Sequence, residues 1–245
     1  MGNTQGFEIV ADGKDFVNIV KALKNMLNEG TFKLDLEGIS LCEMDPTNVS
    51  MISLKMLSSG FIEYKISEPV KISLNFENLY NVLKTINTKK ELIRIKSLNS
   101  DGTGYTKISI NGFTLPLLDL SEATEQKEPE LKFASSFDAN ASVLKDAVKK
   151  ADIIAESLTI SVHDNKVNID AVGDVSNFNQ ILEVEDLVSE NVKSKYSVEY
   201  LKKILDFKHN EVKISLSTDY PMKAVYTSID RFALSYILAP RVEND

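Results

Sequence analysis

The sequence has little of what disulfide-bonded or metal-binding proteins need. Its 245 residues include one cysteine, two histidines and no tryptophan. The single Cys42 excludes an intrachain disulfide and suits a reducing compartment. No histidine lies near it in sequence, and no group of histidines and cysteines has the spacing of metal ligands. We therefore expect a buried, inert Cys42, no metal and no cofactor.

Long apolar runs are also missing. The longest notable uncharged run, residues 232–240, is far too short to cross a bilayer. Residues 1–12 lack the apolar core of a signal peptide, and Gly6 stands where a myristoylation motif needs Ser or Thr. We expect a soluble intracellular protein with no membrane partner.

The chain repeats one pattern of elements in its two halves. Helix-like periodicity is expected over residues 14–29 and 76–86, and again over 140–156 and 198–207. A strand-like block follows the first helix of each half, over residues 31–56 and 158–184. Matching elements are offset by about 122 to 129 residues, which indicates a duplicated domain.

Turn signals predict antiparallel strands in both halves. The Glu37-Gly38, Asn111-Gly112 and Asp164-Asn165 pairs each separate two strand-like runs. Each half is therefore α+β, with two helices against antiparallel sheet. Residues 121–130 are acidic and nearly free of apolar side chains, as in an extended connector. The predicted organisation is a domain over 1–118, a connector over 119–131 and a second domain over 132–245.

The charge distribution separates the helices from the rest of the chain. The net charge is −8, yet the four helix-like segments counted with their flanks, residues 14–29, 76–90, 140–156 and 198–208, together carry +4, which leaves −12 for the remainder. On the first helix the face opposite the apolar stripe has Lys14, Lys21 and three asparagines, with acids only at its flanks. If such helices share a surface, they can attract a phosphate backbone without reading sequence.

Catalytic chemistry has weak support in the sequence. The glycine-rich run 101–104 is followed by no helix pattern, so a hairpin loop explains it better than a phosphate cradle. Asp45, Asp170 and Asp174 are candidate carboxylates, but turn or strand-end roles fit them better. Binding is favoured over catalysis, and we expect no enzyme activity.

The block from Gly38 to Met56, with Glu43-Met44-Asp45-Pro46 at its centre, resembles the DNA sliding clamps of archaea and eukaryotes, often called PCNA. The ending Leu238-Ala-Pro-Arg-Val242 and the first helix are similar to the same family. The resemblance covers nearly the whole chain.

This resemblance implies a trimeric ring of two-domain subunits, with sheets outside and helices lining a central hole around duplex DNA. Its implied partners are a clamp loader, DNA polymerase, flap endonuclease, DNA ligase and two further clamp subunits, identical or different. The implied location is cytoplasmic and nucleoid-associated, or nuclear in a eukaryote. An archaeal source is favoured.

The candidate residues fall into three groups. Lysines of the four helices are expected to face DNA: Lys14, Lys21, Lys24, Lys84, Lys145, Lys149, Lys202 and Lys203. The resemblance implies a pocket for a partner peptide with apolar and aromatic anchors: Met44, Asn48, Val49, Met51, Leu120, Pro221, Ile237, Leu238, Ala239 and Pro240. By position in the family, strands over 107–115 and 175–184 would join subunits through Ile108, Ile110, Phe113, Phe178 and Ile181.

Two alternatives stay open at this point. One is a subunit of a checkpoint-type clamp-like ring with no polymerase role. The other is an enzyme that uses Asp45 and Asp174.

Overall fold

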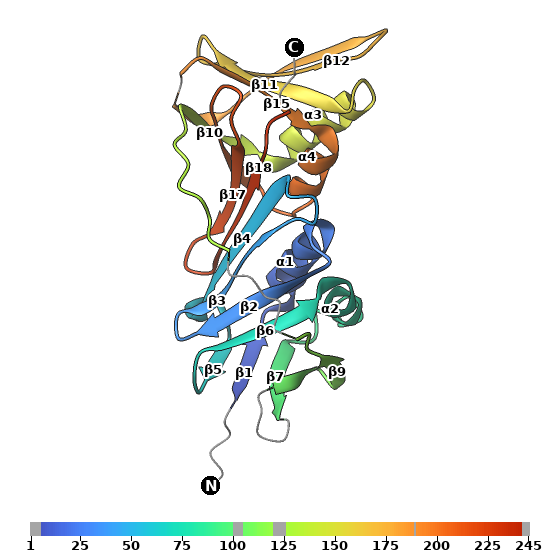
Figure 1. The fold of residues 1–245 in the computed structure, drawn as a ribbon, viewed down its shortest axis with the longest axis vertical. Coiled ribbons are helices and arrows are strands. Elements are labelled where there is room, and N and C mark those ends of the chain that lie inside the picture. Colours follow the sequence, from blue (N-terminus) through green and yellow to red (C-terminus); the bar gives the residue numbers. More distant parts are fainter. Residues whose placement is uncertain (1–5, 100–104, 120–125, 189, 242–245) are drawn as a thin grey trace. The chain divides into compact units, whose positions relative to one another are not determined.

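The computed structural model describes residues 6–99, 105–119, 126–188 and 190–241 (Figure 1). The chain forms two compact units. The first contains the described residues of 1–46, 52–127 and 227–234, and the second those of 47–51, 128–226 and 235–245. The division at 127/128 falls inside the predicted connector. Strands β4, β17 and β18 contribute residues to both units, which a linear domain boundary does not foresee.

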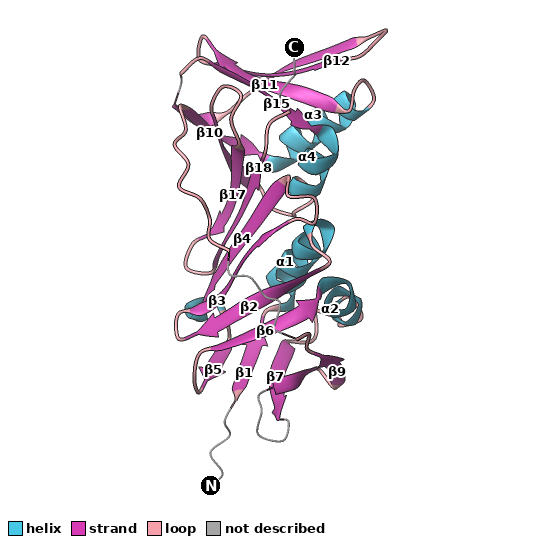
Figure 2. Ribbon diagram, in the orientation of Figure 1, coloured by secondary structure: helices cyan, strands magenta, loops and turns pink. Residues whose placement is uncertain are grey.

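The first unit has two helices and mostly antiparallel strands (Figure 2). The helices are α1 (Gly13–Met26) and α2 (Phe76–Leu83), and one 3-10 turn covers Ser58–Gly60. The strands are β1 (Phe7–Ala11), β2 (Glu29–Asp35), β3 (Gly38–Met44), β4 (Ser50–Leu57), β5 (Glu63–Ile66), β6 (Val70–Asn75), β7 (Ile93–Asn99), β8 (Tyr105–Ile110) and β9 (Phe113–Pro116). They run side by side in the orders β5-β1-β7-β8-β9 and β4-β3-β2-β6.

The second unit repeats this plan. Its helices are α3 (Ala141–Asp152) and α4 (Val198–Ile204). Its strands are β10 (Ser135–Asn140), β11 (Ser157–His163), β12 (Lys166–Val172), β13 (Asn177–Leu182), β14 (Glu185–Val188), β15 (Val192–Ser197), β16 (Glu211–Leu216), β17 (Met222–Ser228) and β18 (Phe232–Leu238). The strand orders are β13-β12-β11-β15 and β14-β10-β16-β17-β18. The predicted α+β fold, with two helices in each half, is confirmed.

At the start of α1, α2 and α3, a side chain accepts hydrogen bonds from free backbone N–H groups, and α4 directly follows strand β15. Asp12 caps α1 by accepting a hydrogen bond from Lys14 N at 2.9 Å, and Asn75 caps α2 through Asn78 N at 2.9 Å. The helices end earlier than periodicity predicts. Leu27 already has an extended backbone, although it continues the apolar stripe and is 4% exposed. The predicted helix is too long because Leu27 is buried like the apolar residues of the helix, although its own backbone is already extended.

Turn geometry confirms two hairpins and corrects a third. Ile110 pairs with Phe113 around Asn111 (φ 44°) and Gly112 (φ 90°), as predicted. The Asp164-Asn165 turn is also found, with φ of 49° and 57°. In the first hairpin Asp35 pairs with Gly38, so the turn is Leu36-Glu37, one residue earlier than predicted. The glycine-rich run 101–104 lies outside the described residues.

Both units bury an apolar core between their helices and sheets. In the first, side chains of α1 and α2 meet those of both sheets, including Ile19, Val20 and Leu79 against Phe32 and Leu54. In the second, α3 and α4 pack on each other and on β11. The polar faces of all four helices are left at the surface.

Candidate nucleic-acid and partner interfaces

The helix surface of the first unit carries lysines beside carboxylates. Lys24 of α1 lies 3.0 Å from the carboxylate of Glu77 on α2, and its ammonium stands 5.1 Å from the centre of the Tyr80 ring. The hydrogen bond from Lys24 lowers the pKa of Glu77, so the acid is ionised at neutral pH. The polar stripe of α1 carries few acids of its own, but the neighbouring helix supplies one.

The other predicted lysines of this unit are placed differently. Lys84 donates a hydrogen bond to Asn81 Oδ1 at 2.6 Å, and its charge adds to the lowering of the Glu77 pKa. Lys14 is exposed and Lys21 is half-buried. Asp15, at the flank of the stripe, pairs with Arg231 at 2.8 Å. The helix surface of the first unit therefore carries cations and carboxylates close to one another.

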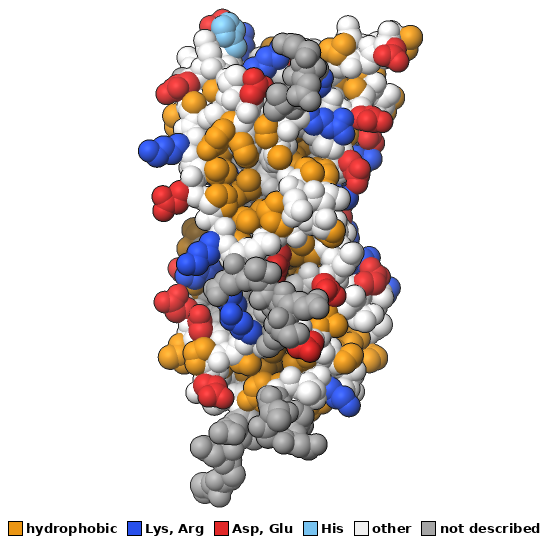
Figure 3. All heavy atoms as spheres, in the orientation of Figure 1, with side chains coloured by type: hydrophobic (Ala, Val, Ile, Leu, Met, Phe, Trp, Pro, Cys, Tyr) orange, Lys and Arg blue, Asp and Glu red, His pale blue; other side chains and the backbone are white. Residues whose placement is uncertain are grey.

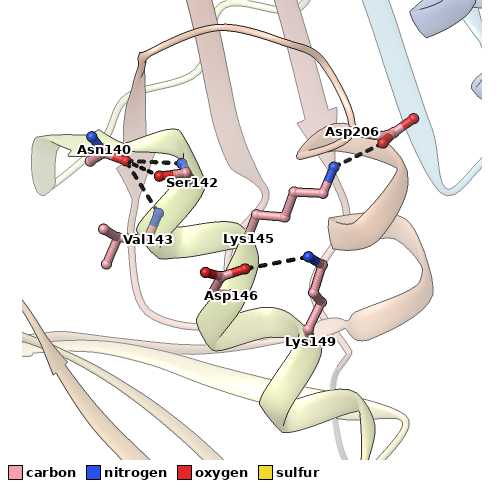
Figure 4. A network of polar contacts seen from close by, with 7 residues as sticks. All are labelled: Asn140, Ser142, Val143, Lys145, Asp146, Lys149 and Asp206. Carbon is pink, nitrogen blue, oxygen red and sulfur yellow. Dashed lines mark hydrogen bonds and ion pairs between the residues drawn. The ribbon is translucent and has the colours of Figure 1, made fainter.

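In the second unit each predicted lysine meets a carboxylate. Lys145 of α3 lies 2.8 Å from Asp206, in the chain just after α4, and Lys149 lies 3.3 Å from Asp146 on its own helix (Figure 4). On α4, Lys202 contacts Asp152 at 2.5 Å.

Lys203 of α4 contacts Glu199 of the same helix at 2.8 Å. Lys24 of the first unit and the four predicted lysines of the second unit thus form ion pairs. Acidic and basic side chains also lie close to one another on the face shown in Figure 3. Such charge-balanced helices would bind phosphates weakly, because exposed pairs reduce the local potential.

The predicted pocket residues of the second unit come together around β18. Ala239 N donates to Val49 O at 3.0 Å, and the buried Ser50 hydroxyl donates to Ile237 O at 2.9 Å. These contacts join two segments almost two hundred residues apart in sequence. They place Val49, Ile237 and Ala239 next to one another.

The other predicted pocket residues differ in how exposed they are and in which unit they lie. Leu238 is 0% exposed and fills the core of the second unit, so the prediction that its side chain lines a surface pocket is wrong. Met51, Pro221 and Pro240 are half-buried, and exposed Asn48 has a left-handed φ of 58°. Met44 belongs to the first unit, and Leu120 lies outside the described residues.

The strand edges predicted to join subunits are only partly as expected. β9 and β13 each end a strand order, whereas β8 lies inside one. Ile108 and Ile110 on β8 are 1% and 0% exposed, so their side chains pack in the core and the prediction that they contact a neighbouring subunit is wrong. Phe113 on β9 and Ile181 on β13 are 46% and 55% exposed. Phe178 is half-buried on β13.

Within the described ranges no three His, Cys, Asp or Glu side chains gather as ligands for an ion. Asp45 is 4% exposed in the first unit. Asp170 in the second unit accepts a hydrogen bond from Asn179. Within the same ranges no helix is long and apolar enough to cross a membrane.

Sequence reasoning missed the residues whose partners lie on other elements. Glu77 on α2 pairs with a lysine of α1, and Asp206, just after α4, pairs with a lysine of α3. The hydroxyl groups of Thr47 and Tyr200 form a hydrogen bond at 2.6 Å. The connector residue Glu128 contacts β17 and β18. Residue periodicity carries no signal for such pairs, because each depends on two elements being adjacent.

Comparison with known proteins places the fold in one family. Residues 10–108 match the model of the N-terminal domain of proliferating cell nuclear antigen. The DNA polymerase sliding clamp of Pyrococcus furiosus is 34% identical over 97% of this chain and 99% of its own length. This chain belongs to the DNA sliding-clamp family. The sliding clamp of Thermococcus gammatolerans is 32% identical over the same shares of the two chains.

Solved structures show the same clamp fold. The PCNA of Thermococcus kodakaraensis superposes with a TM-score of 0.87 and 26% identity over 96% of this chain and 100% of its own. The PCNA of A. fulgidus, solved bound to the C-terminal region of FEN-1, also gives a TM-score of 0.87, at 24% identity over 98% of this chain and 100% of its own. This clamp chain thus spans the full length of its relatives.

Proposed function

We propose that this chain is a subunit of a DNA polymerase sliding clamp, a ring that encircles duplex DNA and tethers replication enzymes to it. The observation that carries the proposal is the match over 97% of the chain to proteins named DNA polymerase sliding clamp. Those names favour a polymerase clamp over a checkpoint-type ring. The ring would act by topology, without catalysis of its own.

The helix faces support a sliding contact with DNA. A topological link needs no tight binding, and ion-paired lysines give weak attraction that is independent of sequence. We propose that the phosphate contacts are shared among the helix lysines of both units, Lys14, Lys21, Lys24 and Lys84 in the first and Lys145, Lys149, Lys202 and Lys203 in the second.

The two exposed strand edges support closure of a ring by identical or similar subunits. β9 of one subunit would pair with β13 of the next. Such head-to-tail pairing gives a closed ring when the rotation from one subunit to the next is a whole fraction of a full turn. A groove of about 620 Å³ beside β13 is lined by exposed Val143 and Ile181 together with four acids, Asp138, Glu183, Glu185 and Glu211. Near β9, exposed Lys107 lies opposite Pro116. Unlike charges at the two edges would favour their pairing.

The residues around Val49, Ile237 and Ala239 support a partner-peptide site. The A. fulgidus PCNA was solved with the C-terminal region of FEN-1. We propose that a flap endonuclease, a DNA polymerase and a DNA ligase present similar segments to this chain. A clamp loader is required to open the ring. A methionine such as Met51 suits several partners, because its side chain repacks at little cost.

A primer-extension assay tests the function. Product length of a replicative polymerase on singly primed circular DNA should increase when the chain and a clamp loader are added. The matched variant Val49→Asp should retain its native mass but lose the stimulation. Unchanged product length with the wild-type chain, at a confirmed ring mass, would contradict the polymerase role.

A further inference from the structure

The connector is attached to the second unit through Glu128. Its carboxylate forms an ion pair with Lys223 Nζ on β17 and accepts a hydrogen bond from Ser235 Oγ on β18 at 3.2 Å. The Lys223 and Glu128 side chains are only 30% and 27% exposed, so solvent screens this pair less than the pairs on the helices. One side chain therefore links the connector to two adjacent strands.

This attachment lies on the face of β18 that carries a candidate pocket residue. Side chains alternate along a strand, and Leu234, Tyr236 and Leu238 are each 0% exposed in the core. Ser235 and Ile237 therefore point to the opposite face. Both are nevertheless nearly buried, at 8% and 9% exposed, which shows that this outer face is covered.

The chain after Glu128 is held at two further points. The Phe133 ring packs edge-on against Tyr220 with centroids 6.1 Å apart, and Ala134 N donates to Ser217 Oγ at 2.9 Å. The Tyr220 carbonyl also accepts a hydrogen bond from Tyr196 at 2.9 Å, which fixes the turn before Pro221. Residues 128–134 thus follow the strands that present the candidate pocket.

We propose that Glu128 is a positioning residue for the partner-peptide site. It holds the C-terminal part of the connector on β17 and β18, so a peptide that binds beside Ile237 meets a chain already ordered. Fixing a residue costs conformational entropy, and preorganisation moves that cost from binding to folding. The inference rests on the proposed function, because it assumes that a partner peptide binds around Val49, Ile237 and Ala239.

Peptide affinity of matched variants tests the inference. The probe is a fluorescein-labelled peptide with the sequence of a flap-endonuclease C-terminal region, titrated against the whole chain in its native assembly. Glu128→Ala should weaken binding about three- to tenfold. Exposed Glu130→Ala removes the same charge from the same connector and should change binding less than about twofold.

A double-mutant cycle distinguishes positioning from general loss of structure. Lys223→Met should weaken the peptide as Glu128→Ala does, and the double variant should be no weaker than either single one. Glu128→Gln keeps an acceptor for Ser235 and should give an intermediate affinity. This variant carries the test if Glu128→Ala fails to fold, as judged by native mass.

Two results would overturn the inference, and they are distinguishable. If the wild-type chain binds the peptide and Glu128→Ala matches Glu130→Ala, the positioning role is wrong while the proposed function stands. If the wild-type chain does not bind the peptide at all, the proposed site itself fails. Additive effects of Glu128→Ala and Lys223→Met would also contradict the role, because they would show that the two side chains act separately.

Discussion

Removing the acid partners of the helix lysines should strengthen DNA binding and make it more salt-dependent. Lys24 is neutralised by Glu77 at 3.0 Å, and Lys202 by Asp152 at 2.5 Å. In the double variant Glu77→Gln, Asp152→Asn, both ammonium groups become available to phosphates. Tyr80 still lies 5.1 Å from the Lys24 ammonium, so that lysine keeps its position.

The magnitude follows from counterion release. Each added phosphate contact increases the slope of log affinity against log salt by about 0.9, or a factor of about 3.5 between roughly 50 and 200 mM salt. Two freed lysines per chain therefore give a slope increase of up to about 1.8 for each chain that touches DNA. At low salt the variant should bind more tightly than the wild type.

Fluorescence anisotropy with a short linear duplex, measured across a salt series, checks this prediction. Glu63→Gln is the matched control, because it breaks the exposed Glu63–Lys65 pair at 2.8 Å on a strand instead of a helix. It adds the same charge as Glu77→Gln, yet should leave the slope nearly unchanged. A double variant with native mass and an unchanged slope would refute the placement of the helices against DNA.

Three further predictions concern assembly and stability. Ile181→Glu at the exposed edge strand should lower the native mass while each chain stays folded, whereas Ile110→Glu should unfold the first unit, because Ile110 is 0% exposed. Gel filtration with circular dichroism separates the two outcomes. An intact ring for Ile181→Glu would contradict the proposed interface. Partial burial raises the pKa of Glu43, so the folded protein loses stability as the pH rises above the ordinary pKa of a glutamate and Glu43 ionises. Glu43→Gln should therefore raise the melting temperature at pH 7 by about 1–2 °C and by less at pH 4. An equal gain at both pH values would contradict this direction. Asn140→Ala removes the cap of α3, where Oδ1 accepts from Ser142 N at 3.0 Å (Figure 4), and should lower the melting temperature by about 2–4 °C in a thermal scan; no change would show that the cap is dispensable.

Much of the fold could be predicted because local signals and tertiary structure agree. The four helices have apolar stripes that the sheets bury, and the turns at Asn111-Gly112 and Asp164-Asn165 need the positive φ that those residues tolerate. The helix ends were less predictable. Leu27 continues the stripe of α1 but is buried in an extended conformation, so burial alone does not reveal where the helix stops.

The errors at the predicted subunit edge have a physical cause that the sequence contained. Ile108 and Ile110 alternate with Lys107 and Ser109, which is the pattern of a strand with one core face. That pattern predicts two buried isoleucines, as observed. The strand order shows that β9, and not β8, ends the order β5-β1-β7-β8-β9.

The ion pairs and the connector contacts could not be predicted. Lys145 and Asp206 are 61 residues apart in sequence, and Lys223 and Glu128 are 95 apart. Their pairing depends on which helices and strands become neighbours. An acidic connector without periodicity carries no sign that one of its carboxylates faces inward.

Release on DNA cleavage tests the proposed topological link between a ring of this chain and DNA. The chain is loaded onto nicked circular DNA with a clamp loader, washed at high salt and then treated with a restriction enzyme that cuts once. We expect the protein to stay on the circle through the wash and to leave after linearisation. Equal retention on circular and cut DNA, or loss of the protein from the intact circle during the wash, would contradict the proposed link.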